Sequence, residues 1–319
     1  MTNTIVYRRA EPADLRPAYA VFRRSLYDYL FRQALVDEAT AKDPPIETGW
    51  ARQGAWIEHL WATSAENWVA VDGAGTVIGW AMSVERDSHL ELTHFFVEPG
   101  VQARGIGRGL IERAFPNGRA RHKSIIATQD APALSLYLRS GVHYVTTSVD
   151  FIVPTSDVEL TGDLTFERLA TDGASIDASI AAVAAIEVAI LGASREPDTR
   201  FLLGMRPGWL AKQNGRVVGF AFGAQPLPPE LDDGSGRVTG PIGALDPADL
   251  PALVDQVVRE AAREGIGEVY VTSPLSNRTA VSHLLSRGYR IDPFYTKILA
   301  SDDTMRLDRW IHTGPVFIL

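Results

Sequence analysis

The chain has 319 residues, of which 45% are hydrophobic and 22% charged, which is the composition of a globular protein long enough for two domains. A net charge of −8 without a basic tail argues against a nucleic-acid partner, and the lack of cysteine excludes disulfides, thiolate metal sites and a cysteine nucleophile. The sequence has no eighteen-residue apolar run, no signal-peptide pattern and no His-x-x-x-His spacing, so we expect a cytoplasmic protein without a membrane partner or a metal.

The first predicted strand covers residues 5–10, and a segment rich in aromatic and acidic side chains follows it. Aromatic rings beside carboxylates suit an amine with an apolar body. However, the helical spacing of Trp56, Leu60 and Trp61 favours a packed core. A hairpin with a glycine-containing turn is predicted over residues 68–81.

An alternating strand at residues 90–97 runs into a glycine-containing loop. Strand geometry predicts Leu90, Leu92, His94 and Phe96 on one face, and Glu91, Thr93, Phe95 and Val97 on the other. The loop, residues 102–107, opens a helix that reaches about residue 115. Small residues at a helix start let backbone N–H groups approach a phosphate, whose charge the helix dipole favours. We therefore predict a diphosphate site, with Arg104 and Arg108 as additional cations.

A dinucleotide site of the Rossmann type is the competing interpretation. It requires Gly-x-Gly-x-x-Gly near the start of a βαβ unit. Here the third glycine is missing at that spacing, and other elements precede the loop.

The motif Val97-x-Pro99-x-x-Gln102-x-x-Gly105-x-Gly107 resembles the acyl-CoA loop of the GNAT N-acetyltransferase superfamily. The resemblance implies an α+β type of α/β fold, in which a mixed, mostly antiparallel sheet is flanked by helices and its fourth and fifth strands splay around the pantetheine arm. It also implies acetyl-CoA as co-substrate and an oxyanion-binding N–H near Val97, where the family's strand bulges. One or two of the basic side chains after the loop would meet the 3′-phosphate of CoA, and a solvated basic face stays open as the alternative. The cofactor-binding residues that it implies are Phe96, Val97, Gln102, Ala103, Arg104, Gly105, Ile106, Gly107, Arg108 and Asp130.

Two residues match catalytic positions of that family. Glu91 stands eleven residues before Gln102, as does the glutamate base of the histone-acetylating members. Glu91 could instead form a structural ion pair, and a water relay or His94 could act as the base. Strand alternation places His94 on the face opposite Glu91, which favours a core role for His94. Tyr137 stands four residues before Gly141, as in the pattern Leu-Tyr-x-x-x-Gly, so the resemblance implies a general acid. Asp130 stands where the family often has asparagine, and its charge is expected to weaken a CoA contact.

The second half repeats the order of the first, with strands predicted at 164–170 and 268–272, a hairpin at 209–221 and a helix at 278–288. This order indicates a tandem GNAT protein, with an intact domain over residues 1–155 and a degenerate one over 156–319. In the second copy Leu245–Ala252 replaces the phosphate loop, with Asp249 as expected helix cap, and Leu284 replaces Tyr137. We therefore predict that the second domain binds no CoA.

From these patterns we expect direct transfer of an acetyl group from acetyl-CoA to a primary amine of a small molecule or peptide. The alternative is a regulator or sensor that binds acyl-CoA without turnover. A homodimer stays open as the quaternary state. The apolar run over residues 308–319 is predicted to pack as a strand or anchor against a sheet or the other domain.

Overall fold

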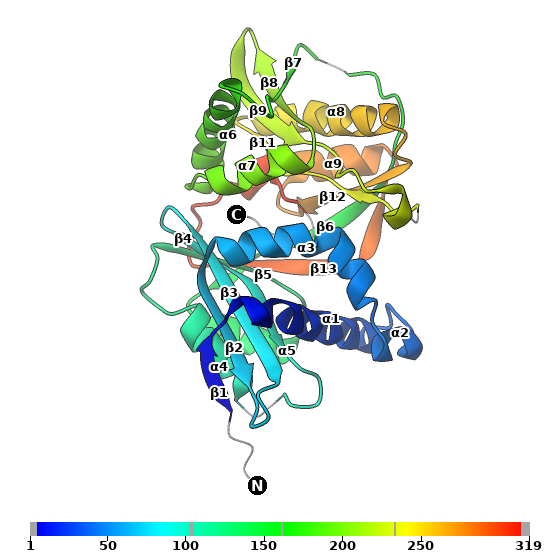
Figure 1. Ribbon diagram of the computed structural model, residues 1–319. Helices are drawn as coiled ribbons and strands as arrows, with labels where there is room; N and C mark the ends of the chain where they lie inside the picture. Colours follow the sequence, from blue (N-terminus) through cyan, green and yellow to red (C-terminus); the bar gives the residue numbers. More distant parts are fainter. Residues whose placement is uncertain (1–4, 103–104, 161, 233, 314–319) are drawn as a thin grey trace. The chain divides into compact units, whose positions relative to one another are not determined.

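The computed structural model describes residues 5–102, 105–160, 162–232 and 234–313 (Figure 1). The chain forms two compact units: Met1–Tyr144 with Leu299–Asp302, and Val145–Ile298 with Asp303–Leu319. The division falls within strand β6 (His143–Pro154). The boundary after residue 155, which follows from the sequence repeat, stays a prediction.

The first unit is built on a sheet in the order β1-β2-β3-β4-β5. Its neighbours pair antiparallel, except that β4 and β5 run parallel. The hairpin predicted over residues 68–81 is confirmed as β2 and β3. The strands are β1 (Val6–Arg9), β2 (Ser64–Val71), β3 (Val77–Arg86), β4 (His89–Val97) and β5 (His122–Ala127).

Helices cover both faces of this sheet. Leu110 of α4 lies over Gly79, whereas Phe22 of α1 lies against Phe96 on the other face, with ring centroids 4.6 Å apart. Side chains of α4 at Ile106, Leu110 and Ala114 are buried, so one stripe of that helix seals the core. The helices are α1 (Leu15–Arg32), α2 (Glu38–Lys42), α3 (Ile46–Ala62), α4 (Ile106–Ala114) and α5 (Ala131–Arg139), with a 3₁₀ turn, η1 (Pro12–Asp14).

A β-bulge interrupts the pairing of β3 with β4. Met82 pairs with His94 and Ser83 pairs with Leu92, so Thr93 is an extra residue in β4. An extra residue transfers every following side chain to the other face. The predicted single alternation from Leu90 to Val97 is therefore wrong. The bulge also lies at Thr93, whereas the resemblance implied one beside Val97.

The second unit contains a sheet in the order β14-β11-β9-β8-β7, whose neighbours all pair antiparallel. Strand β12 pairs with β6 antiparallel and with β10 parallel. The predicted hairpin at 209–221 is confirmed as β8 and β9. The strands after β6 are β7 (Thr165–Arg168), β8 (Gly208–Gln213), β9 (Arg216–Phe222), β10 (Arg237–Val238), β11 (Ile242–Ala244), β12 (Glu268–Pro274), β13 (Arg290–Ala300) and β14 (Trp310–Ile311).

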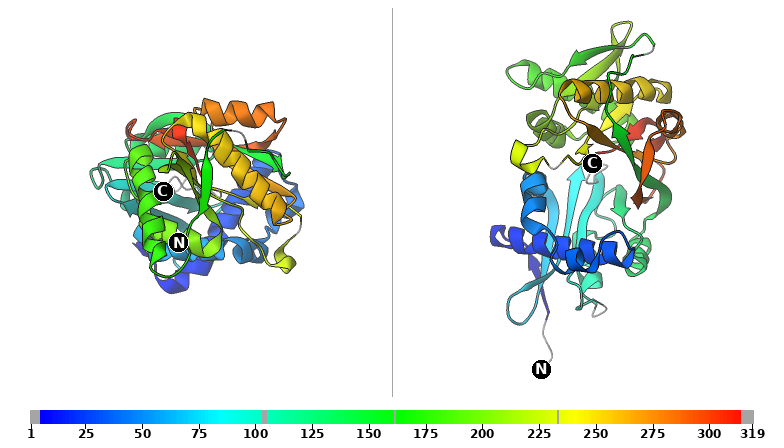
Figure 2. Two further views of the ribbon diagram at one scale, coloured as in Figure 1. Left: turned by 90° about the horizontal axis from the view of Figure 1, so that it is seen from above. Right: turned by 90° about the vertical axis from the view of Figure 1, so that its right-hand side faces the viewer.

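Two helices of this unit, α8 and α9, pack into one apolar core. Helices α8 and α9 lie in contact (Figures 1 and 2), and Leu253, Val257 and Leu284 are fully buried in that core. In the part of the chain that the structure describes, no helix is long and apolar enough to cross a membrane. The helices are α6 (Ser175–Leu191), α7 (Glu196–Met205), α8 (Leu250–Arg263) and α9 (Arg278–Ser286), with 3₁₀ turns η2 (Pro229–Leu231), η3 (Pro247–Asp249) and η4 (Leu307–Arg309).

Candidate active site

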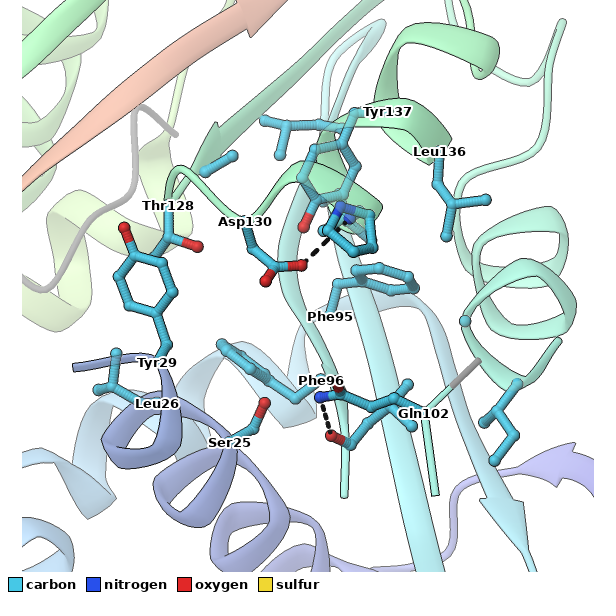
Figure 3. A pocket seen from close by; sticks show the side chains of 18 of the residues that line it. Ser25, Leu26, Tyr29, Phe95, Phe96, Gln102, Thr128, Asp130, Leu136 and Tyr137 are labelled. Atoms are coloured by element: carbon cyan, nitrogen blue, oxygen red, sulfur yellow. Dashed lines mark hydrogen bonds between the residues drawn. The ribbon is translucent and has the colours of Figure 1, made fainter. Parts of the chain in front are cut away.

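A cavity of about 350 Å³ lies where β4 and β5 separate (Figure 3). The two strands pair from His89 with His122 to Leu92 with Ile125 and are unpaired beyond that point. Side chains from α1 on one face of the sheet and from α4 and α5 on the other line the cavity. The opening therefore passes through the sheet, and two ligands could meet in it from opposite faces.

The start of α4 forms one wall of this cavity. Gly105, Ile106, Gly107 and Arg108 line it, and Gly105 has a left-handed backbone with φ of 81°. Among the described residues no side chain caps this helix. The first N–H groups of a helix have no acceptor within it, so they can bind an anion.

The backbone at Gly107 is closely packed. A Cβ atom there would lie 3.2 Å from Phe95 Cζ and 3.3 Å from Leu136 Cδ1. Nearby, Gln102 Nε2 donates to the backbone oxygen of Val97 over 3.2 Å, which ties the loop to the end of β4 (Figure 3). These contacts hold the start of α4 against α5 and tie Gln102, which precedes the helix, to the end of β4.

The positive side chains after the loop are mostly paired within the protein. Arg113 donates to the Gly109 carbonyl over 2.7 Å, and Arg119 pairs with Glu66 and Glu85. Lys123 is buried, and its ammonium donates to three oxygens.

Arg108 is exposed and pairs with Glu112 over 3.0 Å. It stays a candidate for a phosphate contact, because an exposed pair is weak. Ala103 and Arg104, also predicted to bind the cofactor, lie outside the described residues.

Tyr137 stands in the cavity wall on the α5 side. Its ring packs edge-on against Phe95 with centroids 5.6 Å apart, and only 7% of the residue is exposed. Burial, together with the negative charge of Asp130, raises the pKa of the phenol above its ordinary value. The hydroxyl is therefore protonated at neutral pH and can donate a proton into the cavity.

Asp130 also lines the cavity, as N-cap of α5. Its carboxylate accepts from the Ala133 N–H over 3.2 Å and pairs with Arg32 over 3.3 Å. Arg32 also pairs with Asp28 over 3.0 Å. Arg32 thus offsets part of the charge that was expected to oppose a phosphate.

Glu91 and His94 share one face of β4. Glu91 pairs opposite Val84 and His94 opposite Met82, and these two residues of β3 lie on the same side of the sheet. The prediction of opposite faces is wrong, because the bulge at Thr93 shifts the alternation. Glu91 is 1% exposed, and it is not among the described residues that line the cavity, so its catalytic role stays a prediction.

His94 has the environment of a core histidine. Its ring stacks on Trp80 with centroids 4.3 Å apart and lies edge-on to Phe22 at 5.7 Å. Burial lowers the pKa of His94 to about 3, so the imidazole is neutral near pH 7.

Sequence reasoning missed much of the contribution of α1. Tyr29 belonged to the aromatic segment, but Ser25, Leu26 and Arg32 were not singled out, and all four line the cavity. Their spacing at i, i+1, i+4 and i+7 marks one face of a helix and could have shown that they act together. The hydroxyl of Tyr29 accepts from the Gln129 N–H over 3.2 Å, which joins α1 to the end of β5.

The second unit lacks the corresponding features. Asp249 is the N-cap residue of α8, as predicted, but its side chain makes no cap hydrogen bond there. The carboxylate of Asp246 instead caps the preceding turn η3 by accepting from the Ala248 N–H over 2.9 Å. Burial and the charge of Asp246 raise the pKa of Asp249. Leu284, at the place of Tyr137 in the repeat, is fully buried in the core. Over the described residues of both units, no group of three or more His, Asp or Glu side chains could hold a metal ion.

The sequence and the fold of this chain resemble those of known proteins. The family described as Acetyltransferase (GNAT) family matches residues 30–142. Among solved structures, a putative acetyltransferase from Pyrococcus horikoshii is 14% identical, with 96% of this chain and 92% of that one covered and a TM-score of 0.62. A GCN5-related N-acetyltransferase from Sphaerobacter thermophilus is 17% identical, with 93% of this chain and 95% of that one covered and a TM-score of 0.59.

A tandem GNAT protein from the clavulanic acid biosynthesis pathway is 14% identical, with coverage of 99% and 100% and a TM-score of 0.54. A search of curated proteins found no match. The structural likenesses show the fold over almost the whole chain, and the family match lies in the unit that holds the cavity.

Proposed function

Because residues 30–142 match the GNAT acetyltransferase family, we propose that the first unit transfers an acetyl group from acetyl-CoA to a primary amine of a small molecule or peptide. One observation carries the proposal: the uncapped glycine start of α4 and the protonated hydroxyl of Tyr137 line the same cavity.

The residues around the cavity fit an acyl-CoA. Backbone N–H groups of Gly105 to Arg108 would bind the diphosphate, each contact contributing roughly 0.3–1 kcal/mol. Phe96, Val97 and Asp130 would line the pantetheine path between the separated strands. Bound acyl-CoA would supply an activated thioester for attack by an amine.

The chain itself would supply proton transfer and charge stabilisation. Tyr137 would hold its proton ready for the departing sulfur. A backbone N–H of β4, between the bulge at Thr93 and Val97, would stabilise the oxyanion. Glu91 would accept the proton of the alkylammonium, whose pKa is about 10.4 in water, through a chain of water molecules, because Glu91 does not itself line the cavity.

A thiol-release assay with acetyl-CoA and a panel of amines tests this function. The Tyr137→Phe variant should lose about 10²-fold in kcat, the lower end of general-acid effects, while calorimetry still detects acetyl-CoA binding. Tyr295→Phe, at a tyrosine that is 40% exposed in the second unit, is the matched control and should retain full activity.

The alternative function is an acyl-CoA sensor without turnover, because the glycine start of α4 would serve binding alone equally well. Tight binding with no thiol release on any amine would favour the sensor. Full activity of the Tyr137→Phe variant would show that Tyr137 is not the proton donor.

A further inference from the structure

The gap between two corresponding strands holds a cavity in the first unit and a segment of the chain in the second unit. In the first unit β4 and β5 separate after Leu92 and Ile125, and the cavity lies there. By their order in the repeat, β11 and β12 are the corresponding strands of the second unit. Strand β14, near the end of the chain, pairs with β11, and the residue after it bridges to β12.

Backbone pairing joins this segment to both strands. Ile311 pairs with Ile242 and Trp310 with Gly243, both antiparallel. His312 then donates its N–H to the Thr272 carbonyl over 3.1 Å. The segment thus occupies the gap as an additional strand.

The side chains of the segment are buried as in a core. Trp310, Ile311, His312 and Thr313 are each 0% exposed. Trp310 lies edge-on to Phe220 with centroids 5.9 Å apart. Gly243 makes room for it, since a Cβ atom there would stand 3.2 Å from the indole.

Polar side chains of the unit also bind the segment. Asn277 donates to the Trp310 carbonyl over 3.1 Å, Ser148 hydrogen-bonds His312 over 2.5 Å, and Arg206 donates to Thr313 over 3.1 Å. Asn277 corresponds in the repeat to Asp130, which lines the cavity of the first unit. In the second unit the Trp310 carbonyl therefore lies beside Asn277, whose counterpart Asp130 is predicted to contact CoA in the first unit.

We propose that residues 310–313 permanently fill, within the second unit, the cleft that holds the acyl donor in the first unit. The inference rests on the proposed function, since that function makes the first cleft a donor site. It follows that each chain binds one acyl-CoA and that the second unit is closed by its own chain.

A disulfide lock tests the proposal in the full chain. The protein has no cysteine, so Ile242→Cys with Ile311→Cys introduces one defined pair between β11 and β14. We expect one acetyl-CoA per chain by calorimetry in the wild type and in the reduced and oxidised variant. Two per chain in the reduced form, falling to one on oxidation, would overturn the proposal, because the strand would then be a gate.

A second variant keeps the test valid if the cysteine pair does not fold. Asn277→Asp retains the oxygen that caps α9 by accepting from the Ala280 N–H but removes the donor to Trp310. Amide hydrogen exchange over residues 310–312 should then accelerate at least tenfold, whereas exchange within α9 should not change. Asp130→Asn is the matched control and should leave exchange over residues 310–312 unchanged.

The exchange measurement also separates this proposal from the proposed function. If no acetyl-CoA binds, the function fails, but slow exchange over residues 242–244 and 310–312 still supports the filled cleft. Fast exchange there in the wild type, or exchange that acetyl-CoA accelerates, overturns it.

Discussion

Acid should destabilise the first unit through His94. Burial lowers the pKa of this side chain to about 3, against an ordinary value of 6.5. Between these values the unfolded chain binds a proton that the folded chain does not, so stability falls as the pH drops below 6.5. Since pH 5 lies about 1.5 pH units below the unfolded-state pKa of 6.5, His94 lowers the free energy of unfolding at that pH by about 2 kcal/mol.

Replacement by phenylalanine isolates that contribution. Phenylalanine keeps an aromatic ring against Trp80 and Phe22, so stability at pH 7 should change by less than about 1.5 kcal/mol. When the pH falls from 7 to 5, the free energy of unfolding should drop by about 2 kcal/mol less in His94→Phe than in the wild type. Other titrating groups cancel in this difference.

Urea unfolding followed by tryptophan fluorescence at the two pH values measures the effect. His143→Gln, at an exposed histidine, is the control and should keep the wild-type pH dependence. Equal losses of unfolding free energy in the wild type and His94→Phe, or a signal assigned to the His94 imidazole of the folded protein that titrates near pH 6.5, would refute the reasoning.

Four further changes have expected outcomes. Gly107→Ala should raise the Kd for acetyl-CoA about tenfold, because the added methyl group crowds the start of α4, whereas Gly204→Ala, with open space around it, should leave the Kd unchanged. Asp130→Asn should tighten acetyl-CoA binding severalfold in low salt, and an unchanged Kd would show that Arg32 already cancels the charge. Glu91→Gln should lower kcat about 10²-fold at pH 7 with recovery at higher pH; a parallel pH profile would exclude it as base. Deletion of residues 308–319 should lower the free energy of unfolding by about 3–6 kcal/mol, because the buried side chains of Trp310 and Ile311 are lost; an unchanged Tm would contradict the packing of β14.

The sequence determined the elements whose signals are local. Glycines at 105 and 107 after a strand sufficed to predict the start of a helix, whose role as an anion site stays a prediction. The spacing of Tyr137 to Gly141 predicted a tyrosine on a helix that ends there, and the structure places its ring in the cavity wall. The repeated order of strand, hairpin and helix predicted a second copy, because each pattern depends only on neighbouring residues.

Tertiary structure decided the features that depend on pairing between distant segments. The bulge at Thr93 follows from the register of β4 against β3, and it reverses the relation of Glu91 to His94. Arg32 meets Asp130 across 98 positions of sequence. The apolar run after residue 308 was predicted to pack, and residues 310–313 confirm this, while residues 314–319 lie outside the described part. That the segment fills the gap beside β11 required the fold, since an apolar run specifies burial and not the strand that it pairs with.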